Sequence, residues 1–428
     1  MFPQTSAVFP QNNTCHHSRI VSRNPTPSCC SPQMGKTRRI LFVDRSRTEL
    51  GGAEINLLEL LSLQAAREGW ESQVACFPGS RLETALAQLE VSRHAYHTGH
   101  FLGNGRSINP LNRLRNGREF QAAAQRVRDL AAGFRPDAVI SCCTPDHFVC
   151  GEALHLSGIP SLWWVNEIIS PDFQDRHSRR EFAQKARKGA TRVLPVSDFA
   201  RQALIREGIP AEQVITVHNG ISLSRYQKSN STLIRDRFRL APQEPLIGIL
   251  GRFMPWKGQD FFLRLAQAWA TQGRPGRFVL IGHASPEDAA YENRLREYVR
   301  THRLENKVQF LAFQSDLVAT LSQLDLLLHC STKPEPFGRV ILEAMAVGVP
   351  VIAARAGGVP EIVTEGVDAG LAEPSNLDSY LAQMTSLLGN AEKRAAWVLT
   401  GRRTVAQRFT LERVFADFER ILGEVTAK

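Results

Sequence analysis

Short apolar runs alternate with segments of mixed polarity from Arg38 to the end of the chain. In the mixed segments the apolar residues recur three or four positions apart, as they do along one face of a helix. Strands that alternate with helices in this way usually pair in parallel, because each helix returns the chain to the same end of the sheet. The strands expected in the first half are 38–44, 72–77, 91–96, 138–142, 161–165, 192–196 and 214–217.

The same alternation continues in the second half, so the expected fold class is α/β with doubly wound parallel sheets. The segment 98–116 is rich in Gly, Asn and Arg, and we interpret it as a loop. The strands predicted in the second half are 246–250, 277–282, 308–313, 324–329 and 349–353. The helices predicted along the chain are 55–61, 82–89, 120–132, 292–302, 377–388, 393–408 and 411–425.

A length of 428 residues is enough for two domains of ordinary size. Residues 1–37 are rich in Pro, Ser, Asn, Gln and Thr and lack periodicity, so we expect a disordered tail there. We place the first domain at 38–222 and the second at 236–405. A polar linker, 223–235, separates them, and a helix at 406–428 follows the second domain.

Composition limits the partners of the chain. It has 52 basic and 42 acidic residues, a net charge of +10, which suits acidic ligands such as nucleotide sugars or an anionic membrane surface. We find no nucleic-acid-binding motif, so nucleic acid is not an expected partner. No apolar run approaches the ~20 residues of a membrane span, and the N-terminus lacks a secretion-signal pattern.

The eight cysteines show neither a disulfide spacing nor a zinc spacing. This usage favours a reducing, cytoplasmic compartment. Cys15, His16 and His17 together with Cys29 and Cys30 are a possible metal-binding group, but a disordered tail is the favoured interpretation of that region.

The segment 335–350 has the pattern of a ligand site. It follows the expected strand 324–329, and Gly338 opens a helix that ends at Gly348. The junction of loop and helix at the carboxyl end of a parallel strand is where such sheets bind ligands. The free N–H groups and the positive dipole end of the helix favour an anion there.

Two carboxylates bracket this junction, Glu335 in the loop and Glu343 on the helix, with seven residues between them. At a helical rise of ~1.5 Å per residue they lie about 10 Å apart, too far to share one proton. The spacing suits the two ends of a long ligand with a diphosphate between them. Arg339 lies in the first turn, where the helix dipole disfavours a cation unless a phosphate binds beside it. The simpler alternative is that Arg339 and Glu343 are solvated surface residues.

This segment resembles the donor-site signature of family 4 of the retaining glycosyltransferases, in which two glutamates are separated by seven residues. The resemblance extends beyond the glutamates and covers the chain from about Arg38 to the C-terminus. The matching stretches are 335–338 (Glu-Pro-Phe-Gly), 342–346 (Leu-Glu-Ala-Met-Ala), 348–351 (Gly-Val-Pro-Val) and 357–361 (Gly-Gly-Val-Pro-Glu).

The resemblance implies the GT-B architecture, two Rossmann-like domains with parallel sheets that face each other across a cleft. The first domain would bind the acceptor, the second the nucleotide-sugar donor, and the final helix would return to the first domain. The implied activity is transfer of a sugar, with retention, from a UDP- or GDP-linked donor to a hydroxyl of a polysaccharide, a lipid or a small glycoside. No cofactor and no metal are expected, because fixed cations would replace the metal.

The resemblance also assigns roles to residues of this chain. The catalytic residues would be Glu335, on the sugar hydroxyls, together with Arg252 and Lys257, on the donor diphosphate. Glu343 would bind the ribose. The residues expected to bind the donor are Gly52, Phe337, Gly338, Arg339, Val340 and Glu343.

The acceptor side departs from the family pattern. Asn166 stands where many relatives have His, and Glu167 follows it. Ser222 replaces an Asp that relatives often have near the domain crossing. An Asn can still exchange hydrogen bonds with a sugar hydroxyl, and the alternative is that Asn166 only caps a strand end.

The segment 172–188 is predicted to be a basic helix with an apolar side. Such helices can rest on anionic lipid headgroups, which would make the protein peripheral on the cytoplasmic face of a membrane. A solvated charged face is the alternative.

Two other functions are compatible with the same fold. A sugar-nucleotide epimerase would isomerise the donor without an acceptor. A scaffold protein that binds nucleotide sugars would consume no donor at all, and the departures at Asn166 and Ser222 keep this alternative open. A transferase would consume donor only when an acceptor is added.

Overall fold

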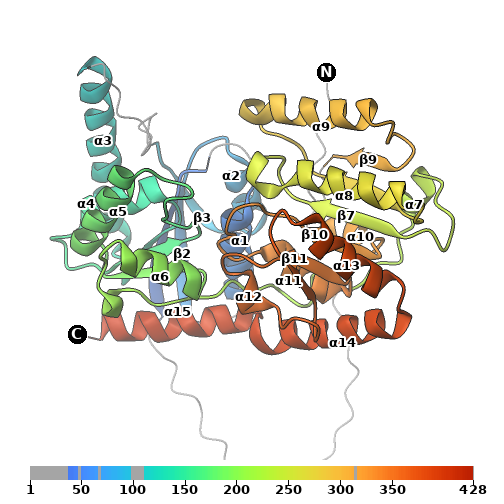
Figure 1. Cartoon of the computed structure of the whole chain (residues 1–428). Helices are drawn as coiled ribbons and strands as arrows, with labels where there is room; N and C mark the ends of the chain where they lie inside the picture. The colour runs from blue at the N-terminus through green and yellow to red at the C-terminus, as the bar shows by residue number, and fades with distance from the viewer. Residues whose placement is uncertain (1–36, 47–49, 66–68, 98–109, 313–315, 428) are drawn as a thin grey trace, which may run out of the picture.

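The computed structural model describes residues 37–46, 50–65, 69–97, 110–312 and 316–427. The chain forms two α/β halves, each built on a six-stranded sheet in which every strand pair is parallel (Figure 1). This arrangement confirms the expected α/β class with two Rossmann-like halves.

The N-terminal sheet has the strand order β3-β2-β1-β4-β5-β6. Its central strand is fully buried from Ile40 to Val43, because helices cover both faces of the sheet. The strands are β1 (Arg38–Asp44), β2 (Trp70–Cys76), β3 (Ser92–Ala95), β4 (Ala138–Ser141), β5 (Ser161–Val165) and β6 (Arg192–Pro195). The helices of this half are α1 (Gly52–Ala65), α2 (Arg81–Gln88), α3 (Pro110–Phe134), α4 (Thr144–Leu154), α5 (Arg176–Gly189) and α6 (Asp198–Arg206).

The C-terminal sheet has the order β12-β11-β10-β7-β8-β9. Its strands are β7 (Leu246–Leu250), β8 (Arg277–Ile281), β9 (Val308–Leu311), β10 (Leu326–His329), β11 (Val351–Ala354) and β12 (Gly370–Ala372). The helices are α7 (Leu233–Arg237), α8 (Gln259–Thr271), α9 (Ala289–Thr301), α10 (Leu317–Leu321), α11 (Arg339–Val347), α12 (Val359–Ile362), α13 (Leu377–Leu388) and α14 (Ala391–Arg408). Short 3-10 turns lie at Ala211–Gln213, Pro255–Lys257 and Pro286–Asp288.

Three expectations from the sequence are wrong. The segment 214–217 is not a strand: Val214 makes one isolated bridge to β6, where Pro195 has no N–H with which to continue the pairing. Residues 110–116, expected in a loop, form the first turns of α3, which has Pro110 at its first position. The basic helix begins at Arg176 rather than at residue 172, because the Asp175 carboxylate caps its first N–H groups. Residues 1–36 and 98–109, expected to be disordered and a loop, lie outside the described residues.

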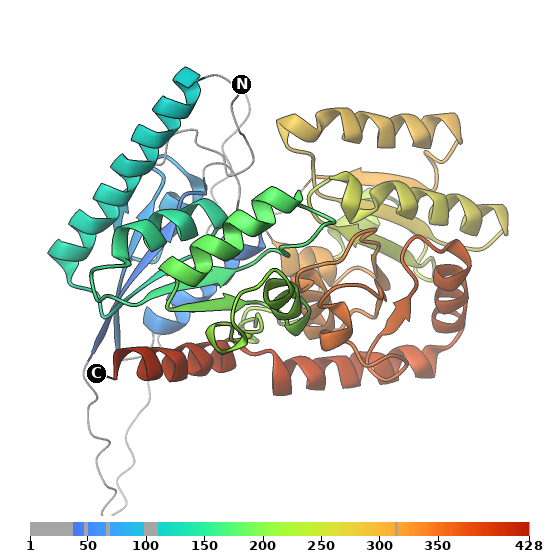
Figure 2. The same ribbon diagram turned by 60° about the vertical axis from the view of Figure 1, so that its left-hand side comes forward.

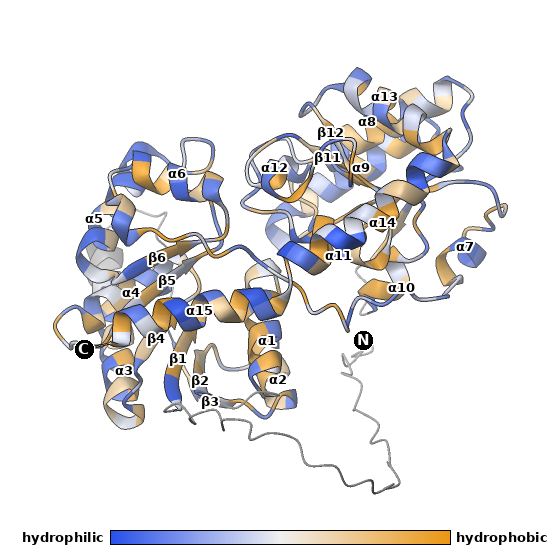
Figure 3. Cartoon of the chain, turned by 90° about the horizontal axis from the view of Figure 1, so that it is seen from below, coloured by the Kyte–Doolittle hydropathy of each residue, from blue (hydrophilic) through white to orange (hydrophobic). Residues whose placement is uncertain are grey.

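Helix α15 (Leu411–Thr426) crosses back to the N-terminal half after α14, and the two helices lie end to end along the base of the molecule (Figure 1, Figure 2). Seen from below, α15 runs across the strands of the first sheet (Figure 3). Phe418 is fully buried there, with its ring 6.5 Å from that of Trp70 and 5.0 Å from that of Trp164. The last helix therefore ties the two halves together by aromatic packing.

We expect Phe418→Ala to destabilise the protein by about 3–5 kcal/mol, because it leaves a cavity between two tryptophans. Thermal unfolding should show a midpoint several degrees lower. Glu424→Ala on the same helix removes only a half-exposed ion pair with Arg420 and should leave the midpoint nearly unchanged. Equal midpoints for Phe418→Ala and Glu424→Ala would contradict the role assigned to this contact.

Candidate donor and acceptor site

Glu335 is a buried carboxylate held by a cation. Its two oxygens are each 2.8 Å from the Lys257 ammonium, and the Ser331 hydroxyl donates to Oε2 at 2.9 Å. The His329 ring nitrogen Nε2 lies 3.3 Å from the same oxygen. Burial alone would raise the pKa of Glu335, but Lys257 and the hydrogen bond to His329 offset this and hold the pKa well below its usual range.

The loop that presents this ion pair depends on two glycines with positive φ. A Cβ on Gly357 would lie 2.1 Å from the carbonyl oxygen of Glu335, and Gly358 donates its N–H to that oxygen at 2.9 Å. A Cβ on Gly258 would lie 2.0 Å from the carbonyl oxygen of Cys330. The glycine motifs around 258 and 357 are therefore needed to bring Lys257 and Glu335 together.

Arg252 follows β7 and is exposed. Its carbonyl oxygen accepts a hydrogen bond from Gln259 at 3.0 Å, which fixes the backbone. Its guanidinium makes no hydrogen bond or ion pair with any residue that the structure describes. The side chain is therefore available to an anionic ligand.

Helix α11 begins behind Gly338, which has no side chain to cap the first turn. The backbone N–H groups of Arg339 and Val340 thus lie at a helix N-terminus suited to an anion. Phe337, expected to bind the donor, has its side chain in the core, 2% exposed and 5.7 Å from the ring of Phe409. A contact from Phe337 to a ligand would have to come from its backbone.

The Arg339 side chain is neither solvated nor free for a phosphate in this conformation. It is 9% exposed, and four of its five N–H groups have partners. Nε donates to Glu343 at 2.7 Å, NH2 contacts Glu59 at 2.8 Å and the Tyr226 hydroxyl at 3.1 Å, and NH1 donates to Asn56. Burial alone would lower the pKa of Arg339, but the carboxylates of Glu59 and Glu343 raise it.

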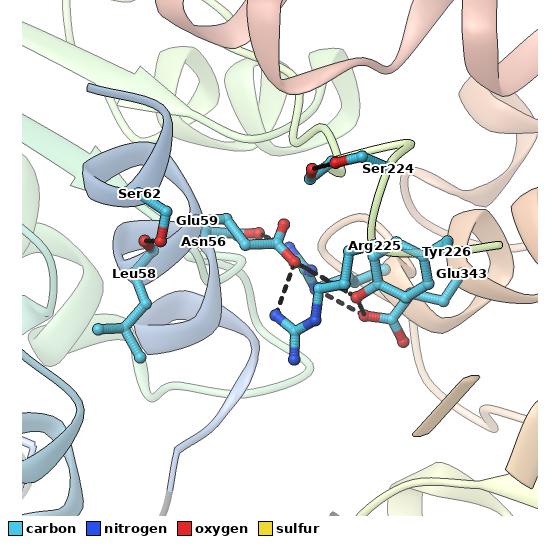
Figure 4. Close-up of polar contacts among 10 residues, drawn as sticks. Asn56, Leu58, Glu59, Ser62, Ser224, Arg225, Tyr226 and Glu343 are labelled. Carbon is cyan, nitrogen blue, oxygen red and sulfur yellow. Dashed lines mark hydrogen bonds and ion pairs between the residues drawn. The ribbon is translucent and has the colours of Figure 1, made fainter. Parts of the chain in front are cut away.

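The partners of Arg339 come from three parts of the chain. Figure 4 shows Asn56 and Glu59 on α1, which face Arg225 and Tyr226 from the segment between the halves and Glu343 from the C-terminal half. The Tyr226 hydroxyl lies 3.1 Å from Glu343, and Arg225 pairs with Glu59 at 3.1 Å. We call these residues, with Arg339, the interdomain network. Glu343 is 5% exposed, so the alternative of a solvated helix position is wrong.

The interdomain network reaches the expected acceptor side. Asn56 donates from Nδ2 to Oδ1 of Asn166 at 3.4 Å, and Asn166 donates to the Trp164 carbonyl at 3.2 Å. Glu167 accepts a hydrogen bond from Thr144, and burial raises its pKa. A residue of α1 thus orients Asn166, whereas Thr144 of α4 holds Glu167.

Gly52 is exposed at the start of α1, and a Cβ there would meet no atom within 4 Å. The preceding Gly51 N–H is 2.6 Å from the Glu54 carboxylate, which also accepts a hydrogen bond from Ser46. The glycine pair therefore leaves open space beside the helix start, as a ligand contact requires, while Glu54 fixes the turn.

A group of buried acids lies below this turn. Asp44 ends β1 with no exposure, and its Oδ2 has no hydrogen-bond partner among the described residues. Burial, with the charges of Glu54 and Asp146, raises the pKa of Asp44 to about 7. Burial also raises the pKa of Asp146 to about 6.

Glu361 joins the halves at a second place. Its carboxylate accepts the N–H groups of Asp198 and Phe199 at 2.8 and 2.7 Å, and so caps α6 of the other half. His218 lies 2.9 Å from the same carboxylate. Asp198, His218 and Glu361 are close enough to hold a cation, but these hydrogen bonds already account for their proximity.

The structure brings Glu335, Lys257, Arg252 and the start of α11 to one end of the C-terminal sheet, and Asn166 and Gly52 to the facing end of the N-terminal sheet. Glu59, Asn56 and Tyr226 were missed by sequence reasoning. Their signal was weak: Glu59 and Asn56 are the polar positions of the apolar stretch 55–61, and Tyr226 is an aromatic residue in a polar linker.

Two family models match the chain. "Glycosyltransferase Family 4" matches residues 50–225, and "Glycosyl transferases group 1" matches residues 230–404. The chain belongs to the family 4 glycosyltransferases. The two matches divide this glycosyltransferase where the structure divides into its two halves.

Individual relatives agree with this membership. The chain is 29% identical over 243 residues to D-inositol 3-phosphate glycosyltransferase of Mycobacterium marinum, a match that covers 55% of this chain and 51% of that protein. It is 28% identical over 216 residues to N-acetyl-alpha-D-glucosaminyl L-malate synthase of Bacillus anthracis, covering 50% and 55%. The chain thus spans about half the length of these curated relatives.

Solved structures match along nearly the whole chain. The crystal structure of Anabaena Alr3699/HepE in complex with UDP and glucose superposes with a TM-score of 0.78 and 26% identity, covering 90% of this chain and 99% of that one. A glycosyltransferase from Rickettsia africae has the same fold, with a TM-score of 0.73 and 20% identity. The GT-B architecture of the family 4 glycosyltransferase follows from these likenesses.

Asp44 makes the stability of the protein depend on pH. Its pKa is higher in the folded chain, about 7, than the ordinary 3.8, so the folded state binds this proton more tightly. The stability that this proton confers is complete below pH 4 and is lost as the pH rises toward 7. The free energy of unfolding falls by roughly 4 kcal/mol at most over this range.

Asp44→Asn removes this titration. We expect the variant to be more stable than the wild type at pH 8, with a difference that narrows at pH 5, as measured by denaturant unfolding. Asp129→Asn, at an exposed position of α3, should leave the pH profile unchanged. A stability difference for Asp44→Asn that stays constant between pH 5 and pH 8 would show that Asp44 does not titrate in this range.

Proposed function

We propose that this protein is a retaining, metal-independent glycosyltransferase that moves a sugar from a nucleotide-diphosphate donor to an acceptor hydroxyl. The observation that carries the proposal is the Glu335–Lys257 ion pair at the end of the C-terminal sheet that also bears the exposed Arg252 and the uncapped start of α11. These groups supply positive charge at this end of the sheet, where the diphosphate would depart.

Each group has a part in this reaction. Arg252, the Lys257 ammonium and the N–H groups of Arg339 and Val340 would meet the negative charge that builds on the leaving diphosphate. Glu335, kept ionised by Lys257, would accept hydrogen bonds from the sugar hydroxyls. Because these charges are in place before the donor binds, little reorganisation is needed in the transition state.

The donor that we propose is UDP-linked, since HepE, at 26% identity over the whole fold, binds UDP and glucose. Glu343 would bind the ribose. The acceptor is a hydroxyl compound bound near Asn166 and Glu167, and Gly52 would bind the donor. The names of the relatives, with inositol phosphate and malate, favour a small acceptor, but a polysaccharide or a lipid-linked glycoside fits the same chemistry.

Contact with an anionic membrane through 172–188, from the cytoplasmic face, stays a prediction. The apolar side of α5 packs in the core at Phe182 and Ala186, so only cations would reach lipid. None of the described helices is long and apolar enough to span a membrane. The exposed basic residues of α5 are Arg176, Arg180, Arg187 and Lys188.

Nucleotide binding tests the donor site. With UDP at a hundred times its dissociation constant, the protein should gain about 2.7 kcal/mol of stability and unfold at a higher temperature, whereas GDP and ADP should have little effect. Arg252→Met should lose this shift and keep the midpoint of the unliganded protein, because the exposed side chain has no partner among the described residues to lose. Arg403→Met, exposed on α14, is the matched control. No shift with any nucleotide would contradict the proposal.

Turnover tests the chemistry. The wild type should release UDP slowly from UDP-α-glucose with water as acceptor, and proton NMR should show the α-anomer of glucose first. Glu335→Ala should lower this rate at least tenfold, since removing one preorganised contact costs on the order of 3 kcal/mol. Unchanged turnover in Glu335→Ala would contradict the catalytic role of Glu335, and the β-anomer as first product would contradict retention.

A further inference from the structure

Arg339 lies between two buried carboxylates from opposite halves of the molecule. It is 2.8 Å from Glu59 on α1 and 2.7 Å from Glu343 on α11. The side chains of Arg339, Glu59 and Glu343 are only 9%, 4% and 6% exposed. A buried ion group of this kind persists only when its charges balance and its hydrogen bonds are made.

The contacts of Glu343 all use one of its two oxygens. Oε1 accepts from Nε of Arg339 and lies 3.1 Å from the Tyr226 hydroxyl. Oε2 has no hydrogen bond with any residue that the structure describes, and it is not fully buried. The Glu343 carboxylate is thus fixed through one oxygen and leaves the other able to accept a hydroxyl.

Glu59 is the unusual member of the group. Arg225, Tyr226 and Arg339 all contact its Oε1, and its Oε2 is buried without a partner among the described residues. A carboxylate that is left with one unsatisfied oxygen in the interior costs stability.

We propose that Glu59 is a positioning residue for the donor nucleotide and acts through Arg339 on Glu343. The inference rests on the proposed binding of the ribose by Glu343. By holding NH2 of Arg339, Glu59 keeps Nε on Glu343 and so fixes the carboxylate for the ribose hydroxyls. Without the Glu59 charge, the guanidinium would lose one of its two carboxylate partners, and the Glu343 carboxylate would no longer be fixed for the ribose hydroxyls.

This arrangement makes donor recognition a property of both halves. The groups proposed to bind the diphosphate and the ribose lie in the C-terminal half, but the residue that orients one of them lies on α1 of the N-terminal half (Figure 4). The protein should therefore recognise the ribose of the donor only when the two halves are in contact.

The test compares UDP with 2′-deoxy-UDP by titration calorimetry. The wild type should prefer UDP by about tenfold, because the deoxy compound loses a hydroxyl bound by Glu343. Glu59→Gln should weaken UDP about tenfold and leave 2′-deoxy-UDP nearly unchanged, so that the preference disappears. Ser62→Ala is the matched control: Ser62 lies one turn along α1, and its hydroxyl bonds only the Leu58 carbonyl among the described residues. It should keep the wild-type preference.

Tyr226→Phe provides a second variant that changes no charge, in case Glu59→Gln does not fold. It removes the hydroxyl between Arg339 and Glu343 and should reduce the preference for UDP by a few fold, whereas Ser224→Ala in the same segment should not. A preference that survives both Glu59→Gln and Tyr226→Phe would overturn the inference, as would equal losses for both nucleotides. Failure of the wild type to bind UDP would refute the proposed function instead, and the inference with it.

Discussion

The relation between the two halves depends on one buried guanidinium. Arg339 starts α11 in the C-terminal half, and its nearest carboxylates are Glu343 on its own helix and Glu59 on α1 of the other half. Because a cation this deep is stable only with compensating charge, the α1 and α11 surfaces must stay together or the cation must find another anion. The closing helix α15 and the cap that Glu361 gives to α6 hold the halves from other sides. The domain junction is thus electrostatic at its centre and apolar at its base.

The proposed donor site also depends on a buried charge that is paired. Glu335 is buried against Lys257, and the glycines at 258 and 357 allow the close backbone approaches that bring the two residues together. Charges that are already paired and oriented are the form of preorganisation that stabilises a developing diphosphate. Arg252 has no side-chain partner among the described residues, so its guanidinium is free to bind an anionic ligand. On the acceptor side, Asn56 holds Asn166, so the residue that replaces the family His is also set by the interdomain network.

Much of this could be predicted from the sequence because buried parallel strands are continuous apolar runs; the strands at 38–44, 161–165 and 246–250 have the predicted bounds. The roles of Arg252, Lys257, Glu335 and Glu343 in binding a donor are implied by the resemblance to family 4, and they stay predictions. The wrong or missing predictions concern polar segments and contacts between residues far apart in the sequence. The segment 214–217 fails as a strand because of Pro195 on its neighbour, and 110–116 is helical although its composition suggested a loop. Glu59, Tyr226 and Arg339 meet across more than a hundred residues of sequence, which no local pattern encodes.

The central claim is that Arg339 serves the two carboxylates and that the diphosphate is left to Arg252, Lys257 and the backbone. A crystal structure of the protein with UDP tests this directly. The account predicts that the ribose hydroxyls lie on Oε2 of Glu343, that the diphosphate lies at the start of α11 beside Arg252 and Lys257, and that the Arg339 guanidinium remains between Glu59 and Glu343. An Arg339 side chain turned onto the diphosphate, with Glu59 left unpaired, would contradict it.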